Sequence, residues 1–596
     1  MSNKKIILAS LAVTIVLAGV ALVSLAMFHS DDKKATVQNV AAVKAKQQGI
    51  KDTTTAKAAP KAKAPVTKPV PKPDLTVEGY LRDAGGKPVA GVVVSDSYSS
   101  TVTDSLGHYR FTRAKGARFV WYCIPADFEV PTHSSSDNTA LFYQPLTATK
   151  TKYNFTLHRL PSGKETRYNL IVFGDPQVTN AYSPYYTGPN DNWVKKSDVA
   201  RFTDETMADV KKLISQWKNT PVYAISMGDD VQYYGGYNPT LERQIREALG
   251  SSRAKVFSVI GNHDQDGTLK YLRKWEENFG PTDYSFDRGD IHYVCFNDVR
   301  FYKDKYRYWQ PGELLTSQMN WLREDLRLAD KHKKVIVCYH IPLTFGNNPY
   351  REALPLNIPS EPKQFISSDL RDILGELSTF EGGFELFCGH THFALNHEIT
   401  FEGKHLMEHC HAAACGTIWQ SNINICGTPN GYYVYDINGT HFTDSYYKGT
   451  FWPRDKQMTI FYANSDFNGE SYSADWNIPR DKHAIVANVF NADSRWHVVA
   501  IEDGVEHEMK RISHNGQDAF AAGYHHKYAK SVSYQFISKK SGYLIMNHLF
   551  YYEPKSEKST VIIRATDEYG HVYTASSADA ITEPFYNFAH YYKKTF

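Results

Sequence analysis

Seven side chains that could bind metal ions are spread over the middle of this 596-residue sequence. In chain order they are Asp175, Asp229, Asn262, His263, His340, His390 and His392. Carboxylates, amide oxygens and neutral imidazoles are ligands for borderline divalent or trivalent cations, and without a thiolate they do not form a closed structural zinc site. The set therefore predicts an open, hydrolytic metal centre. Two ions about 3.5–4 Å apart can share a carboxylate, generate hydroxide from water and neutralise phosphoryl oxygens during in-line attack.

The candidate ligands follow short apolar runs that read as buried strands. The runs are Asn169–Phe173, Val222–Met227, Val256–Ile260, Val335–Tyr339 and Phe384–Cys388, with a further run at Ile291–Phe296. The segments between them are longer, and in residues 199–217 apolar side chains recur at helical spacing. Strands that alternate with helices predict an α/β sheet, whose strand ends collect ligands. We therefore expect the ligands to converge at one edge of the sheet.

Five motifs in this order resemble the calcineurin-like metallophosphoesterase superfamily. They are Gly174-Asp175-Pro176-Gln177, Gly228-Asp229-Asp230, Gly261-Asn262-His263-Asp264, the strand-end His340, and Gly389-His390-Thr391-His392. The resemblance implies an α/β fold with a two-sheet metallophosphoesterase sandwich in α-β-β-α layers, flanked by N- and C-terminal β-sandwich-like domains. It also implies a metal-dependent phosphoric ester hydrolase that uses a metal-bridging hydroxide.

The family roles carry over onto matching positions of this sequence. As the resemblance implies, Asp175, Gln177 and His392 hold one metal ion, Asn262, His340 and His390 hold the other, and Asp229 bridges them. His263 is not a ligand but assists the leaving group, and Asp264 orients its ring; imidazole suits this because its ordinary pKa is about 6.5. Gln177 departs from the commonest motif, which has His there. An amide oxygen is a harder and weaker ligand, so the identity of the ions (Mn, Fe or Zn) stays open.

The first 74 residues have a different character. Asn3-Lys4-Lys5 precedes an uncharged apolar run from Ile6 to Phe28, so segment 1–30 is predicted to be either a membrane anchor or a cleaved signal. Residues 31–74 are rich in Pro, Lys and Ala and form an expected spacer without a core. Both features predict an exported protein, periplasmic or at the cell surface, with its body held away from a membrane.

The globular part is predicted to have three domains. Residues 75–160 show short alternating strands and resemble a transthyretin-like module, 166–450 are the catalytic domain, and 451–596 read as a C-terminal β domain with strands at 483–489, 496–502, 531–537 and 560–565. Asn422, Asn424 and Thr428 either reach the substrate or form a turn. Cys295, Cys338 and Cys388 are expected core thiols, while Cys410, Cys415 and Cys426 leave room for one disulfide.

Charge and composition limit the classes of partner and substrate that the sequence predicts. A formal net charge of +3 does not argue for a nucleic-acid surface, so the expected substrate is a phosphorylated small molecule or an envelope component. Monoesters, diesters, pyrophosphates of nucleotide sugars and phosphoproteins all remain possible substrates, since specificity resides in loops at 174–199, after Asp229 and at 302–312. A non-catalytic surface or scaffold protein with a structural metal site is the alternative, and a non-ligand His263 beside an acid favours catalysis over it.

Overall fold

The computed structural model describes residues 75–581 except 180–196, 233–237, 303–304, 307–313, 345–355, 359–367, 420, 466, 468–470, 474–475, 477, 480–482, 516–517 and 529–544. All of these residues belong to one unit of the chain, Pro73–Phe596. The apolar segment 6–28 and the spacer 31–74 lie outside the described residues, so their roles stay predictions. In the part of the chain that is described, no helix combines the length and apolar character needed to cross a membrane.

Two seven-stranded sheets form the centre of the fold. The first runs in the order β25 (His441–Gly449), β24 (Gly431–Asn438), β10 (Arg167–Phe173), β12 (Val222–Ser226), β14 (Lys255–Ser258), β7 (Asp137–Ala140) and β6 (Thr132–Ser134). The second runs in the order β15 (Tyr284–Arg288), β16 (Ile291–Cys295), β19 (Lys334–Cys338), β21 (Phe384–Cys388), β23 (Lys404–Cys410), β22 (Leu395–Phe401) and β20 (Leu356–Ile358).

The central strands of both sheets are parallel. Strands β10, β12 and β14 pair in parallel, as do β16, β19 and β21. Their near-continuous apolar sequences suit this arrangement, because both faces of a parallel sheet are covered. The predicted ligands follow five of these six strands, namely β10, β12, β14, β19 and β21.

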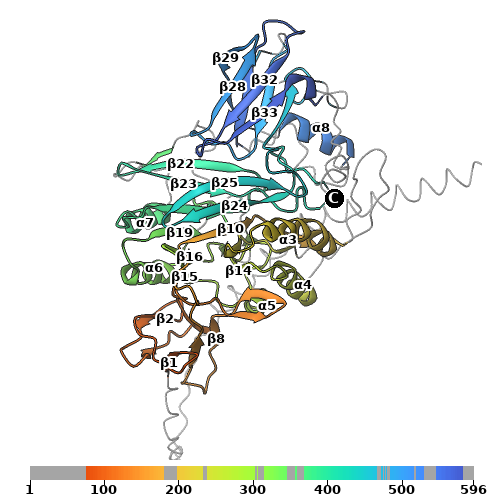
Figure 1. Cartoon of the computed structure of the whole chain (residues 1–596). Helices are drawn as coiled ribbons and strands as arrows, with labels where there is room; N and C mark the ends of the chain where they lie inside the picture. The colour runs from red at the N-terminus through yellow and green to blue at the C-terminus, as the bar shows by residue number, and fades with distance from the viewer. Residues whose placement is uncertain are drawn as a thin grey trace, which may run out of the picture. The chain divides into compact units, whose positions relative to one another are not determined.

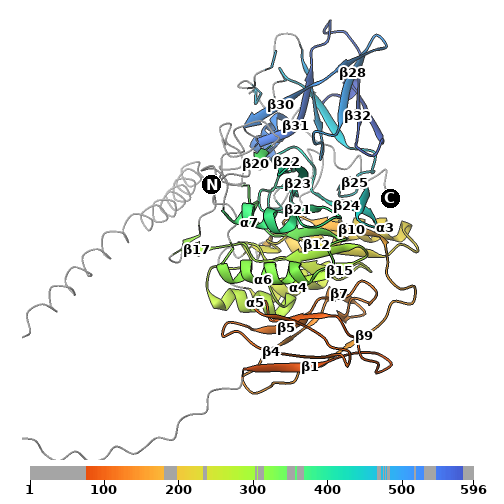
Figure 2. The same cartoon turned by 90° about the vertical axis from the view of Figure 1, so that its left-hand side faces the viewer.

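Helices cover the two outer faces. Chain order gives α2 (Asp198–Arg201), a π-helical turn η1 (Phe202–Thr206), α3 (Met207–Gln216), α4 (Pro239–Leu249), α5 (Leu269–Phe279), α6 (Thr316–Leu328) and α7 (Ser368–Leu377). In Figure 1, α3 and α4 lie at one side of the sheets and α6 and α7 at the other, and the turned view of Figure 2 places α6 and α7 in front.

The residues of β10 show how the layers are packed. Leu170 and Val172 point into a core shared with the second sheet, whereas Ile171 and Phe173 pack with Val210 and Ile245 of the covering helices. The alternation follows from the period of two along a strand. The predicted sandwich of α-β-β-α layers is confirmed.

The N-terminal module contributes to the core sheet. Its own two sheets have the orders β4 (His108–Thr112), β1 (Thr76–Asp83), β9 (Phe155–Leu157), and β3 (Ser100–Val102), β2 (Val93–Ser95), β5 (Phe119–Tyr122), β8 (Tyr143–Pro145). In chain order, β6 and β7 lie between β5 and β8. They extend the first core sheet, where Thr139 of β7 pairs with Val256 of β14. The predicted division near residue 160 therefore crosses a continuous sheet.

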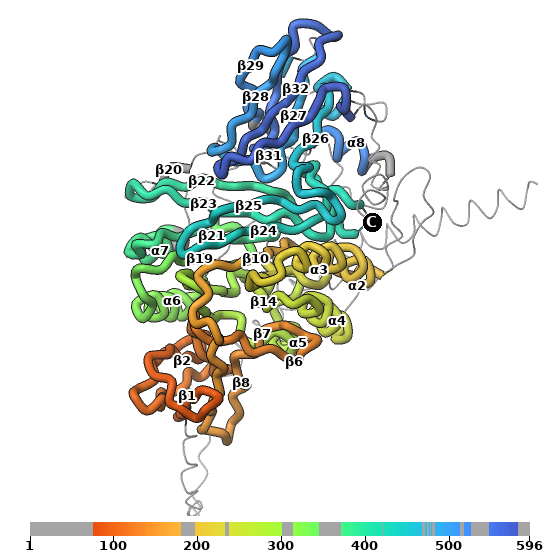
Figure 3. The backbone as a smooth tube through the Cα atoms, in the orientation of Figure 1, coloured from red at the N-terminus to blue at the C-terminus, as the bar shows by residue number. Residues whose placement is uncertain are grey.

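The C-terminal part contains two four-stranded sheets and a helix. Their orders are β26 (Met458–Tyr462), β27 (Ile485–Val489), β31 (Ile545–Tyr552), β30 (Lys510–Asn515), and β29 (Val505–Glu508), β28 (His497–Glu502), β32 (Val561–Thr566), β33 (Val572–Ser576). Helix α8 is Ala519–Tyr528, and a short 3-10 turn, η4, is Ser577–Asp579. Figure 3 shows these segments, coloured cyan to blue, beyond β25 and β24, of which β24 pairs with β10. The strand predicted at 531–537 lies outside the described residues.

All seven cysteines are described, and all are buried free thiols. Cys295, Cys338 and Cys388 lie in core strands, as predicted. The one disulfide for which Cys410, Cys415 and Cys426 left room is not formed: all three are buried free thiols, and burial raises the pKa of Cys415 and of Cys426.

Candidate metal centre

The predicted site residues converge although they come from five separate strand ends. Asp175 and Gln177 follow β10, Asp229 follows β12, Asn262 and His263 follow β14, His340 follows β19, and His390 and His392 follow β21. The side chains of Asp175, Asp229 and His340 are almost completely buried. Parallel strands bring these groups together because their carboxyl ends meet at one edge.

Two overlapping clusters of potential ligand atoms share one carboxylate. Ligand atoms of Asp175, Asp229 and His392 lie within 4.8 Å of one another, and so do those of Asp229, His340 and His390. His392 Nε2 is 3.7 Å from Asp175 Oδ1, and His340 Nε2 is 3.2 Å from Asp229 Oδ2. Asp229 is thus the only member common to both, which is the position a bridging ligand requires.

The ring of His340 is held so that one nitrogen faces the clusters. Its Nδ1 lies 2.8 Å from the carbonyl of Met227, which accepts the Nδ1 proton, so Nε2 is the nitrogen that could bind a metal ion after losing its proton. Nε2 lies 2.9 Å from Asn262 Oδ1, whose other neighbour is His390 Nδ1 at 2.8 Å. Three electron-rich atoms converging in this way fit a cation.

Buried oxygens support the same fit. Gln177 Oε1 is buried and accepts no hydrogen bond from any described residue, and the buried Asp229 Oδ2 faces the His340 and His263 rings. A buried acceptor left without a donor costs about 1–3 kcal/mol, and a cation would satisfy Gln177 Oε1. The donor set of oxygens and imidazole nitrogens suits Mn, Fe or Zn.

The electrostatics of the cluster are dominated by burial and mutual charge. Burial raises the pKa of Asp175 well above its usual value, and it lowers the pKa of His390 to about 3 and that of His392 to about 4. Burial also acts to lower the pKa of His340, but Asp229 and Asp175 raise it to about 10. His390 and His392 are therefore neutral near pH 7, the form that binds metals, and binding at His340 would displace its proton.

The backbone around the centre is strained. Five site residues have left-handed φ angles: Asp175 (33°), Gln177 (39°), Asp229 (51°), His390 (71°) and His392 (62°). Residues other than glycine rarely adopt this conformation, and strain of this kind concentrates at functional sites. Gly261 permits the close approach of the loops, since a Cβ there would lie 2.2 Å from Asp229 Oδ1.

His263 lies beside the clusters without belonging to either. Its main-chain N–H donates to Asp229 Oδ1 at 2.7 Å, its Nε2 is 4.0 Å from Asp229 Oδ2, and its side chain is 22% exposed. Burial lowers the pKa of His263, so the ring is neutral at pH 7. This placement, next to the bridging carboxylate and open to solvent, suits contact with a substrate.

The structure corrects the role predicted for Asp264. Both of its carboxylate oxygens accept main-chain N–H groups, from Val231 at 2.9 Å and from Gly261 at 2.8 Å. The carboxylate is completely buried behind the loop. Asp264 therefore holds two ligand-bearing loops together instead of orienting the His263 ring.

Sequence reasoning missed Asp298, which supports His340 from behind. Its two oxygens accept the main-chain N–H groups of His340 (3.1 Å) and Ile341 (3.0 Å), and burial raises its pKa to about 7. The available signal was its position just after the apolar run 291–296.

It also missed a second support, formed by Arg201 and Trp419, for which no sequence signal existed. Trp419 Nε1 donates to the carbonyl of Pro176 at 2.8 Å, between the candidate ligands Asp175 and Gln177. Arg201 lies over the Trp419 ring, 4.9 Å from its centroid, and Arg201 Nη1 donates to its carbonyl. The indole therefore fixes the loop that carries two candidate ligands.

Asn422, Asn424 and Thr428 are buried, with Asn424 and Thr428 in a turn and Asn422 Oδ1 accepting from Arg201 Nη2, so the turn expected for this segment is present. Asn424 Nδ2 donates to the carbonyls of Ala413 and Pro429 and to Thr428 Oγ1. The loops expected to set specificity lie largely outside the described residues, so that expectation stays a prediction.

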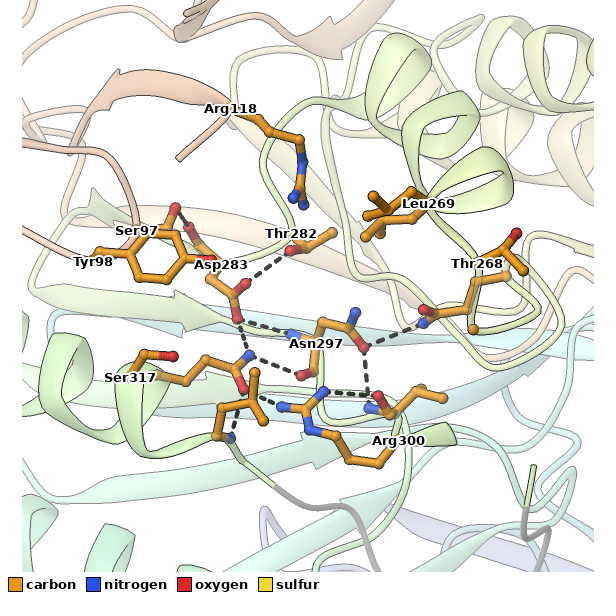
Figure 4. Close-up of a pocket in the computed structure, with 16 residues that line it drawn as sticks. Ser97, Tyr98, Arg118, Thr268, Leu269, Thr282, Asp283, Asn297, Arg300 and Ser317 are labelled. Carbon is orange, nitrogen blue, oxygen red and sulfur yellow. Dashed lines mark hydrogen bonds between the residues drawn. The ribbon is translucent and has the colours of Figure 1, made fainter. Parts of the chain in front are cut away.

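A pocket of about 290 Å³ lies between the N-terminal module and the core, lined by Tyr98 and Arg118 on one side and by Asn297 and Arg300 on the other (Figure 4). Gln318 donates to Asp283 Oδ1 at 2.5 Å and to the carbonyl of Asn297 at 2.9 Å. Because Asn297 precedes Asp298, this network fixes the segment that supports His340.

Comparisons with known proteins give one family. Residues 75–160 match a model for the N-terminal part of calcineurin-like phosphoesterases, 139–394 match calcineurin-like phosphoesterase itself, and 408–573 match the C-terminal part. No curated protein matches the chain.

Solved structures similar to the chain share little sequence with it. A dimetal phosphatase from Danio rerio has 12% identity and a TM-score of 0.30, covering 48% of this chain and 96% of its own. A purple acid phosphatase from yellow lupin (Lupinus luteus) has 13% identity and a TM-score of 0.25, covering 73% and 68%. A sulfate thiohydrolase from Thermus thermophilus has 9% identity and a TM-score of 0.27, covering 47% and 56%.

Proposed function

The chain belongs to the calcineurin-like phosphoesterase superfamily, and on that premise we propose that it hydrolyses phosphate mono- or diesters outside the cytoplasm with two metal ions. It is a metal-dependent hydrolase of phosphate esters. The observation that carries the proposal is the pair of ligand clusters that share Asp229.

The residues would divide into two ligand sets. Asp175, Gln177, Asp229 and His392 would hold one ion, and Asp229, Asn262, His340 and His390 the other. Two bound ions supply a nucleophile derived from water at neutral pH and neutralise charge on the phosphoryl oxygens. The chain itself supplies geometry: the Met227 carbonyl fixes the His340 ring, and Asp298 fixes its main chain.

His263 would contact the ester. Its neutral ring can donate a hydrogen bond to the leaving oxygen, where negative charge develops as the bond to phosphorus breaks. Its main-chain bond to Asp229 Oδ1 keeps it at a constant distance from the bridging carboxylate.

The export of the protein and the nature of its substrate are also proposals. The apolar segment 6–28 followed by the spacer 31–74 supports a membrane-anchored or secreted protein in the periplasm or at the cell surface. A phosphorylated small molecule or an envelope component would then be the substrate.

The first test compares hydrolysis of p-nitrophenyl phosphate and bis(p-nitrophenyl) phosphate by the purified full chain in detergent. Mn²⁺, Zn²⁺ and iron are each supplied. We expect turnover of at least one ester, because a clustered ligand set of this kind activates water. Removal of the ions with a chelator is expected to abolish turnover, and adding them back to restore it.

Two variants serve as controls. Asp229→Ala is expected to abolish turnover, because both ligand clusters lose their common member. Asp372→Ala removes an exposed carboxylate of α7 and is expected to leave turnover unchanged. A folded protein that cleaves neither ester with any metal would make the scaffold function the better explanation.

A further inference from the structure

Gln177 is joined through its main chain to the residue that supplies the bridging carboxylate. Its main-chain N–H donates to the carbonyl of Asp229 at 2.7 Å, and the residue is only 1% exposed. The left-handed φ angle of Gln177 turns its side chain away from the direction that a regular strand would give. The side chain can therefore act only within the buried centre.

The two ends of its amide have different surroundings. Gln177 Nε2 donates to Gln232 Oε1 at 2.7 Å. Gln177 Oε1 is buried and accepts no hydrogen bond from any described residue. An amide can rotate by half a turn at little intrinsic cost, so its partner decides which atom faces which way.

The partner comes from a neighbouring ligand loop. Strands β11 (Val178–Thr179) and β13 (Val231–Gln232) pair in parallel, with Val178 opposite Val231 and Thr179 opposite Gln232. These short strands directly follow the loops of Asp175 and Asp229, and Gln232 is 4% exposed. Gln232 is thus fixed by the same backbone that positions two candidate ligands.

We propose that Gln232 is a positioning residue that directs the amide oxygen of Gln177 toward the cation of Asp175, Asp229 and His392, and so makes this half of the centre select harder cations. The proposal rests on the two-ion centre of the proposed function. If the amide turned, its N–H groups would face the cation and oppose binding. By accepting from Nε2, Gln232 Oε1 keeps the oxygen available.

The consequence is an asymmetric pair of sites. The Asp175 side has three oxygen donors, from Asp175, Gln177 and Asp229, and one imidazole. The His340 side has two oxygen donors and two imidazoles. Oxygen ligands suit Mn²⁺, whereas imidazole suits Zn²⁺ and iron, so the Asp175 side should hold Mn²⁺ more readily than its neighbour does.

The test measures metal content and uses two substitutions at one position. Gln232→Met is similar in length but accepts no hydrogen bond, whereas Gln232→Glu can only accept. The full chain and both variants are stripped of metal, loaded with Mn²⁺ and analysed by elemental mass spectrometry and titration calorimetry. Circular dichroism and thermal melting establish that each variant is folded.

We expect two Mn²⁺ per wild-type chain. In Gln232→Met, one site should weaken by about 10–100-fold, the range typical of residues that orient metal ligands, while the other is unchanged. In Gln232→Glu, neither site should weaken, because the direction of the bond is preserved and the added carboxylate attracts cations. A merely structural role would not produce this division between the two variants.

Several outcomes would overturn the inference. It fails if Gln232→Met holds both ions as tightly as wild type, or if Gln232→Glu loses the same site as Gln232→Met. A wild-type chain that binds two ions but cleaves no ester would overturn the proposed function alone. A chain that binds no ion overturns both.

Discussion

At the scale of single residues, His263 and Asp264 are neighbours in the chain with different tasks. His263 Nε2 lies 4.0 Å from Asp229 Oδ2, and its ring is partly open to solvent. The Asp264 carboxylate is buried and accepts hydrogen bonds from two main-chain N–H groups. We predict that His263→Ala lowers kcat by about 10²–10⁴-fold, which is the usual contribution of a proton-transfer group to the rate. The metal content should be unchanged. The loss should be larger for methyl phosphate esters than for p-nitrophenyl esters, since a basic leaving group needs more help.

Asp264→Asn provides the comparison. An amide nitrogen facing the N–H groups of Val231 and Gly261 repels one of them, so both ligand loops loosen. We expect metal retention and thermal stability to fall, without dependence on the leaving group. Equal losses for good and poor leaving groups in His263→Ala would argue against its role at the leaving oxygen.

At the scale of elements, the loop after β23 supports the loop after β10 through a single indole. Trp419 donates to the Pro176 carbonyl, and the left-handed φ of 60° at Trp419 shows that the loop is strained to make this contact. We predict that Trp419→Phe lowers the free energy of unfolding by about 1–3 kcal/mol, the cost of an unsatisfied buried carbonyl, and also weakens metal retention.

The matched control is Trp275→Phe. Trp275 packs in the same core cluster, is equally buried, and its indole N–H has no hydrogen-bond partner among the described residues. This change removes ring area but no hydrogen bond. If chemical denaturation shows the same loss for both variants, and metal retention is equal, the contact with Pro176 has no special role.

At the scale of the whole molecule, a buried ion-pair network of the core lies against the N-terminal module, which contacts it through the Cys123 thiol. His292 lies between Asp287 (2.8 Å) and Asp325 (2.9 Å), and Asp287 also accepts from Lys333 at 2.6 Å. Burial acts to lower the pKa of His292, but Asp325 and Asp287 raise it well above its usual value. The Cys123 thiol of the N-terminal module also forms a hydrogen bond with the His292 side chain. His292 is therefore an imidazolium near pH 7.

This raised pKa predicts a stability that depends on pH. Because the folded pKa exceeds the unfolded value of about 6.5, the contribution is complete below pH 6.5 and is lost as the pH rises through the folded pKa. We expect His292→Gln to lower the free energy of unfolding by about 3 kcal/mol at pH 6 and by less at pH 9. His332→Gln, at an exposed pair with Glu381, is the control and should have little effect.

Denaturation of wild type and both variants from pH 6 to 9 checks this expectation. A loss in His292→Gln that stays constant over the whole range would mean that the protonated ring is not what stabilises the junction. A loss of equal size in His332→Gln would indicate a general charge effect.

The sequence by itself determined the ligand types, their order and the alternation of strands and helices around them. Apolar runs such as 169–173 and 335–339 became central parallel strands because their residues are apolar on both faces. The order of the motifs was sufficient to predict the ligand cluster, because each ligand follows its strand closely in the sequence. The local sequence therefore also indicates the end of the sheet at which the ligand lies.

Only the tertiary structure decided which groups support those ligands. Gln232 bonds to Gln177 across 55 residues, and Trp419 reaches Pro176 across 243, distances at which no local pattern operates. It also showed that β6 and β7 join the core sheet and that Asp264 binds main-chain groups. The physical reason is that such supports depend on which loops meet in space, and this is set by packing of whole layers and not by the neighbours of a residue in the chain.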